Sequence, residues 1–164
     1  MFPQILLVIP LFITFQKLRL LDSHIGLIIV YAAFAMPFTV WVLRGFFESI
    51  PEELEDAAAI DGARPLQTFH RIILPLATPA LAVTGFLGFI AGWTEYYFSV
   101  IFLSDASQFT LALALNGMVG QYATQTPWSE FSAFAIMFAL PVSIVYIFLQ
   151  KYIIGGLAIG GVKG

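Results

Sequence analysis

The sequence predicts an all-α integral membrane protein, and three observations support that fold class. Of the 164 residues, 60% are hydrophobic and only 10% are charged, whereas soluble domains are about half apolar and about a quarter charged. The apolar residues form runs long enough for membrane-spanning helices. One long polar segment, Glu52–Pro75, interrupts these runs and holds seven of the seventeen Asp, Glu, Lys and Arg residues.

Composition also excludes several classes of function. The net charge is −3 and no basic patch could collect phosphates, so we expect no nucleic-acid partner. The chain lacks cysteine, which removes disulfides, thiolate metal sites and a cysteine nucleophile. The two histidines, His24 and His70, fall on opposite sides of the membrane in the topology below. We therefore expect no enzyme, no metal site and no cofactor.

We expect the first span at residues 1–21. Its apolar run ends at Phe15 and covers only about 22 Å of a hydrocarbon core about 30 Å thick. Lys17 and Arg19 would have to extend their charged ends to the interface. A signal peptide is the alternative, but no basic region precedes the run and no small-residue cleavage site follows it.

Three further spans are expected at residues 25–46, 76–100 and 131–149. Pro37 and Pro141 fall inside two of them and predict kinks. In the span 76–100, the pair Gly88 and Gly92 would let another helix approach closely.

Glu95 is the one ionisable residue well inside an expected span, close to Trp93, Tyr96 and Tyr97. A carboxylate within the membrane marks a candidate pathway or interface site. The alternative is that Glu95 reaches the outer interface, where aromatic residues gather.

The segment 102–130 carries no Lys or Arg, and Asn116 within it is a second candidate pathway residue. The tail 150–164 is rich in glycine, and Gly156 and Gly161 have the spacing of a phosphate-binding loop. Val162 displaces Lys163 from the required position and no Ser or Thr follows, so that motif is excluded.

Basic residues near the span ends predict the orientation. With the polar segment 49–75 in the cytoplasm, five basic residues lie inside (Arg44, Arg64, Arg71, Lys151 and Lys163) and two lie outside (Lys17 and Arg19). This choice gives four spans with both ends cytoplasmic and leaves 102–130 outside.

The polar segment predicts two short helices. Ser49, Pro51 and Glu52 have the pattern of a capping box and helix start. Gly62 is placed to end that helix in a left-handed conformation, and Pro65 opens the next. We expect the chain to turn back towards the membrane at Leu74-Pro75. On the first helix Leu54, Ala57, Ala58 and Asp61 share a face, with the glutamates over the remaining arc.

The spacing of this segment resembles the EAA loop, E-A-A-x3-G-x9-I-x-L-P, of permease subunits in ATP-binding-cassette importers. Asp56 stands where that pattern has Glu, and Glu55 beside it could substitute. The resemblance implies that separate ATPase subunits dock on this loop. The implied coupling residues are Glu55, Asp56, Ala57, Ala58, Asp61, Gly62, Ala63, Ile72, Leu74 and Pro75.

The ending GGVKG resembles sugar-importer permeases of the maltose type, specifically the second permease of a heterodimeric pair. That implies an importer-permease fold in the inner membrane of a prokaryote, working with a second permease and an extracytoplasmic sugar-binding protein. Four spans are fewer than such subunits usually have, so we expect the C-terminal portion of a longer permease. A truncated, non-transporting remnant or a membrane scaffold remains the alternative.

Overall fold

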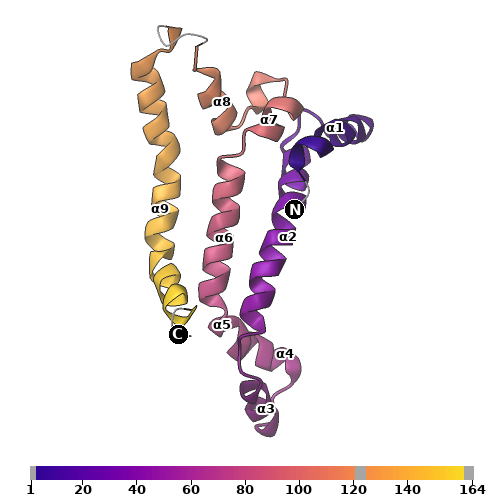
Figure 1. The fold of residues 1–164 in the computed structure, drawn as a ribbon, viewed down its shortest axis with the longest axis vertical. Coiled ribbons are helices and arrows are strands. Elements are labelled where there is room, and N and C mark those ends of the chain that lie inside the picture. The colour runs from indigo at the N-terminus through magenta and orange to yellow at the C-terminus, as the bar shows by residue number, and fades with distance from the viewer. Residues whose placement is uncertain (1–2, 121–124, 161–164) are drawn as a thin grey trace. The chain divides into compact units, whose positions relative to one another are not determined.

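The computed structural model describes residues 3–120 and 125–160, and the secondary structure of this part is entirely helical (Figure 1). The described residues group into two compact units, Met1–Ala35 with Ile90–Val142, and Met36–Phe89 with Ser143–Gly164. The elements in chain order are η1 Gln4–Leu7, α1 Val8–Lys17, α2 His24–Phe47, α3 Glu53–Ile60, α4 Pro65–Thr68, η2 Phe69–Ile73, α5 Leu74–Leu76, α6 Thr78–Trp93, α7 Tyr97–Phe102, η3 Ala106–Gln108, α8 Leu111–Gly117 and α9 Trp128–Gly160.

The first unit is built on an aromatic core. The rings of Phe34 and Phe98 stack at 5.0 Å between centroids, and the ring of Phe102 lies 5.2 Å from Phe15 and 5.9 Å from Phe98. Leu27 and Val30 of α2 are buried in the same core. Aromatic pairs at these separations stabilise a protein beyond the contribution of the area they bury. Side-chain packing therefore holds α1, α2 and α7 together.

The turn from α1 into α2 requires close backbone approach. A Cβ at Gly26 would lie 2.1 Å from the carbonyl oxygen of Leu20, so only glycine fits there. A carboxylate oxygen of Asp22 accepts the backbone N–H of Asp105 at 3.0 Å and also that of Ser104. A ring nitrogen of His24 lies 2.8 Å from the carbonyl oxygen of Gln108. These contacts tie the start of α2 to the segment that follows α7.

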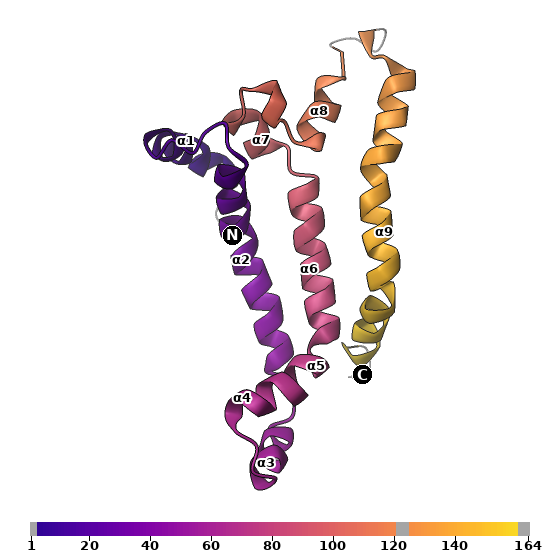
Figure 2. The same ribbon diagram turned by 180° about the vertical axis from the view of Figure 1, so that it is seen from behind.

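The second unit contains the C-terminal half of α2, the polar segment and the first part of α6. Figure 2 shows α3 and α4 beside one another beyond the C-terminal end of α2. In the same unit the rings of Phe86 and Tyr146 lie 5.8 Å apart and join α6 to α9.

Two helices are long and apolar enough to cross a membrane, α2 over His24–Phe47 and α9 over Trp128–Ile153. Pro65–Leu76 and Thr78–Trp93 together are also long and apolar enough for a third span, but the two helices are bent by 67° relative to each other. Ile5–Lys17, within the expected first span, is apolar but shorter than a crossing requires. The four span ranges therefore stay predictions.

Parts of two expected segments fall outside the described residues: 121–124 of the segment 102–130, and 161–164 of the tail with its GGVKG ending. Before that point α9 continues to Gly160, well beyond the expected end of the span at 149. Pro37 and Pro141 lie inside α2 and α9 as expected.

Candidate functional site

The turn between α2 and α3 differs from the predicted capping box. The Ser49 hydroxyl donates back to the carbonyl of Phe46 at 2.7 Å, so it completes the end of α2. The N-cap of α3 is Glu52, which makes no side-chain capping bond. The prediction failed because a serine just past a helix end can satisfy a free carbonyl there instead of an N–H of the next helix.

The C-terminal end of α3 confirms the predicted role of Gly62. Its φ is +78°, in the left-handed region. The N–H of Ala63 donates to the carbonyl of Ala58 at 2.9 Å, and the N–H of Gly62 donates to that of Ala59 at 3.0 Å. These two bonds form a Schellman motif, which satisfies the last carbonyls of the helix. At the N-terminal end of α3, the acidic residues of the first turn interact favourably with the positive end of the helix dipole.

The second short helix begins at Pro65, as predicted. The backbone N–H of Arg64 donates to the side-chain oxygen of Gln67 at 2.9 Å, which satisfies one free donor at this helix start. The helix then widens into the π-turn η2, where the N–H of Leu74 donates to the carbonyl of Phe69. Pro75 has no N–H and its ring would crowd the preceding turn, so a π-turn relieves it.

The chain does not turn at Leu74-Pro75. It stays helical to Leu76, and the 67° bend follows at Ala77, which is fully buried. Pro79 cannot donate to the ladder across this point, and the Thr78 hydroxyl donates to the carbonyl of Leu74 at 3.4 Å. The chain therefore bends at Ala77, just before Thr78 and Pro79, which is two positions later than the sequence suggested.

The predicted coupling residues divide into packed and surface positions. Ala58 is buried within the segment, while Ala57 and Asp61 are exposed, so the expected shared inner face is only partly realised. Glu55 and Asp56 line a cavity of about 560 Å³ between the end of α2, α3 and α4. Its other lining residues are Phe47, Ile50, Ala59, Ala63, Pro65, Thr68, Phe69 and Ile73. Ile72 and Leu74 are partly buried, and Pro75 is exposed.

Four large apolar side chains of this segment are exposed, and two of them, Ile60 and Leu66, are much more exposed than Leu54 and Phe69. Ile60, at the C-terminal end of α3, is 87% exposed, and Leu66, at the start of α4, is 69% exposed. Neither residue is among those expected to dock, although an isoleucine two residues before a glycine cap in a polar segment is a usable signal in the sequence. Exposed apolar groups rimmed by charge are typical of a protein contact surface.

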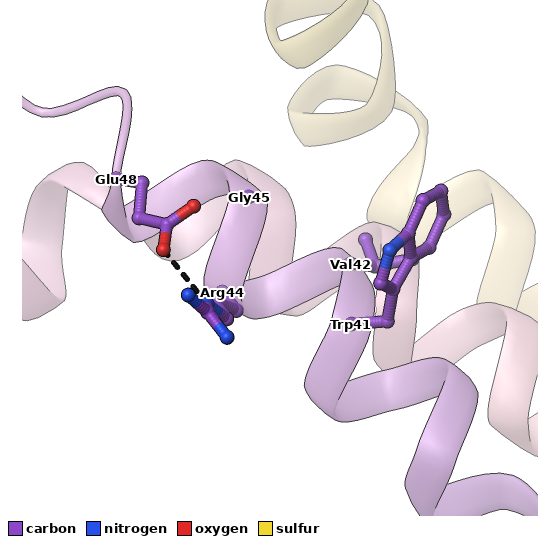
Figure 3. A pocket seen from close by; sticks show the side chains of 5 residues that line it. All are labelled: Trp41, Val42, Arg44, Gly45 and Glu48. Atoms are coloured by element: carbon purple, nitrogen blue, oxygen red, sulfur yellow. Dashed lines mark hydrogen bonds and ion pairs between the residues drawn. The ribbon is translucent and has the colours of Figure 1, made fainter.

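A smaller cavity of about 470 Å³ lies along the end of α2 (Figure 3). The guanidinium of Arg44 pairs with the carboxylate of Glu48 at 2.7 Å, one turn later on the same side of the chain. Trp41, one turn earlier, is 74% exposed. A tryptophan and an arginine at the end of an apolar helix are typical of a membrane interface.

Glu95 lies in a break between α6 and α7, not in a continuous helix. Its Oε1 accepts the N–H of Phe98 at 2.7 Å, and its Oε2 accepts the N–H of Ser99 at 3.2 Å, so the carboxylate caps α7. The hydroxyl of Tyr31, from α2, donates to Oε2 at 2.6 Å. Sequence reasoning could not find Tyr31, which is 64 positions away in the chain.

Asn116 is not among the residues that hydrogen-bond to the Glu95 carboxylate. It is exposed on α8 and lines a groove of about 250 Å³ with residues of the α6–α7 break and of α9. The other lining residues are Thr94, Tyr96, Ala112, Leu115, Val119, Phe131 and Phe138. The structure thus places the two predicted pathway residues in one unit but in different surroundings.

The predicted glycine pair of α6 is likewise divided. A Cβ at Gly92 would lie 3.7 Å from a ring carbon of Tyr31, so α2 approaches there, whereas nothing lies within 4 Å at Gly88.

Outside the spanning helices, the backbone N–H of Ser107 donates to Asp105 at 2.9 Å and holds the pKa of that carboxyl below its usual range.

Apolar helices with exposed hydrophobic faces, interrupted by a folded polar segment, are typical of an integral membrane protein. The chain belongs to the family of binding-protein-dependent transport system inner membrane components, which it matches over residues 1–158.

Named relatives agree with this family. The chain is 38% identical to the ABC transporter permease protein ORF1 of Streptomyces antibioticus, over 99% of this chain and 70% of that protein. It is 39% identical to the maltose/maltodextrin permease MalG of Escherichia coli and of Vibrio vulnificus, over its whole length but 56% of theirs.

Solved structures agree on the fold. A bacterial ABC transporter involved in the import of the acidic polysaccharide alginate superposes with a TM-score of 0.69 at 32% identity. That match covers 88% of this chain and 55% of the other. The chain thus has the fold of an ABC importer permease and spans a little over half the length of several relatives.

Proposed function

We propose that this chain is a membrane-spanning permease subunit of an ATP-driven sugar importer in the cytoplasmic membrane of a prokaryote. The observation that carries the proposal is the family membership over residues 1–158 together with relatives named as maltose/maltodextrin permeases. The chain itself would perform no covalent chemistry. Its partners would be ATPase subunits in the cytoplasm, a second permease, an extracytoplasmic sugar-binding protein and the bilayer.

The polar segment 49–75 would be the surface on which the ATPase docks. Support comes from its position between apolar helices and from its two most exposed large apolar side chains, Ile60 and Leu66. The acidic first turn of α3 would meet basic groups of the partner, and a complementary charge chiefly speeds and orients docking. Ile60, the more exposed of the two apolar groups, would supply the buried anchor that such interfaces need.

Co-purification tests this proposal. The tagged chain is expressed with its candidate ATPase and partner permease, solubilised in detergent and recovered by the tag. We expect the wild type to retain the ATPase and Ile60→Glu to lose it, because a charge would be buried at the contact. Since Ile60 is 87% exposed, the substitution should leave the fold intact.

Val119→Glu is the matched control. Val119 is 54% exposed and lies in the segment predicted to face the other side of the membrane. It should retain the ATPase. Retention of the ATPase by Ile60→Glu would refute Ile60 as the anchor, and absence of any complex with the wild type would count against the permease role.

A further inference from the structure

The carboxylate of Glu95 does more than cap a helix. Three of its bonds are local: the donors are the backbone N–H of Phe98, three residues further along the chain, and the backbone N–H and hydroxyl of Ser99, four residues further along. The fourth is a bond from the Tyr31 hydroxyl, 2.6 Å from Oε2, and it comes from a different helix. One side chain therefore both starts α7 and joins it to α2.

Three hydroxyl groups form a hydrogen-bonded cluster at the Glu95 carboxylate. Thr110 donates to the Ser99 hydroxyl at 3.3 Å, and that hydroxyl lies 2.6 Å from the hydroxyl of Tyr31. Tyr31 donates to Oε2, and the Ser99 hydroxyl, 3.2 Å from the same oxygen, can donate either to Tyr31 or directly to the carboxylate. Ser99 is fully buried, so these bonds are not open to exchange with bulk water. No Lys or Arg of residues 3–120 and 125–153 pairs with Glu95, whose carboxylate is held by hydrogen-bond donors.

The two joined elements have a particular place in the chain. α2 leads into the polar segment, and α6, which ends just before Glu95, leads out of it. The Tyr31 ring also packs beside α6 at Gly92. The Tyr31–Glu95 bond thus links the two helices that bracket the polar segment, at the ends remote from it along the chain.

We propose that Glu95 is a positioning residue that ties the α6–α7 break to α2, so that a displacement of the polar segment reaches both elements together. The functional consequence of this tie rests on the proposed docking of an ATPase on the polar segment. Without the tie, α2 and the break could respond separately. Tyr31→Phe is the sharpest perturbation, because it removes only the cross-helix bonds of the Tyr31 hydroxyl to Glu95 and Ser99 and leaves the cap of α7 and the ring packing in place.

Hydrogen exchange on the chain in detergent tests the tie itself. We expect Tyr31→Phe to speed exchange about tenfold or more in residues 24–35 and 94–103, the loss expected for a hydrogen bond to a charged group. Glu95→Gln should add faster exchange at the amide of either Phe98 or Ser99, because the NH2 group that replaces one carboxylate oxygen cannot accept an N–H bond. Tyr97→Phe is the control, since that exposed hydroxyl makes no hydrogen bond to the described residues. Unchanged exchange in Tyr31→Phe would overturn the tie.

The same variants in the assembled complex, with and without ATP and vanadate, test the positioning role. In the wild type both regions should change exchange when nucleotide is trapped. In Tyr31→Phe only one of them should change, a result that a merely stabilising bond would not give. If both still change, the proposal is wrong while the permease role stands. If no complex assembles, the permease role fails and the detergent measurement still decides the tie.

Discussion

Gly62 offers the sharpest test of how the polar segment is held. Its φ of +78° is a conformation that costs an L-residue roughly 1–2 kcal/mol. A Cβ added there meets no atom within 4 Å, so Gly62→Ala introduces backbone strain without a clash. The strain corresponds to roughly a five- to thirtyfold shift in a local opening equilibrium.

The assay is hydrogen exchange of the peptide covering α3. We expect Gly62→Ala to exchange faster by roughly that factor and Gly62→Asn to lie nearer the wild type, since asparagine tolerates the left-handed region. Gly45→Ala is a control of opposite sign. Gly45 is helical and also has nothing within 4 Å, so alanine should slow exchange at the end of α2 through roughly 0.5–1 kcal/mol of stabilisation. If Gly62→Ala exchanged like the wild type, the Schellman motif would not be what holds α3 closed.

Two further predictions concern the first unit. Trp93→Phe keeps an aromatic ring near Phe138 but loses the indole N–H bond to the Phe138 carbonyl at 3.1 Å. It should cost about 0.5–1.5 kcal/mol and lower the thermal inactivation midpoint in detergent, whereas Trp41→Phe, at an exposed position, should not. The pKa of Asp105 is lowered in the folded chain, so its bond to Ser107 contributes stability above the ordinary carboxyl pKa near ~3.9 and loses it as the pH falls through the lowered value. A carboxyl carbon NMR titration with a midpoint at or above ~3.9 would contradict this.

Local chemistry explains what the sequence could predict in the polar segment. A glycine after a helix-forming run and a proline three residues later each restrict the backbone by their own covalent structure, and the structure confirms both at Gly62 and Pro65. The family resemblance rested on such fixed spacings, and the match over residues 1–158 bears it out.

The failures share a different cause. Ser49 had two free groups within reach, a carbonyl behind it and an N–H ahead, and sequence spacing cannot say which one a hydroxyl chooses. At Pro75 we expected a turn, because a proline normally ends a helix, but the π-turn before it kept the chain helical to Leu76. Local rules identify the residues where an ordinary helix cannot continue unchanged, but they do not predict which conformation or hydrogen bond the chain adopts there.

Long-range contacts were beyond a single sequence. Glu95 was singled out as a lone carboxylate within an apolar stretch, yet what holds it is set by Tyr31, Ser99 and Thr110. Nothing in the spacing of these residues links a tyrosine near the start of α2 to a glutamate beyond the end of α6. The packing of α2 against α6 at Gly92 and against α7 in the aromatic core brings the two together.

The π-turn at Phe69–Ile73 has a consequence for comparing this chain with its relatives. A π-turn places one more residue in a helical turn than the α-helix does, so the turns on either side of it keep nearly the same rotational phase. Deleting a single residue from this turn would therefore leave an ordinary helix of almost the same reach, with Leu66 and its neighbours in nearly their present direction. Relatives that are one residue shorter between Gly62 and Pro75 should lack the π-turn and keep the flanking side chains in place, and aligned relatives can be inspected for that pattern.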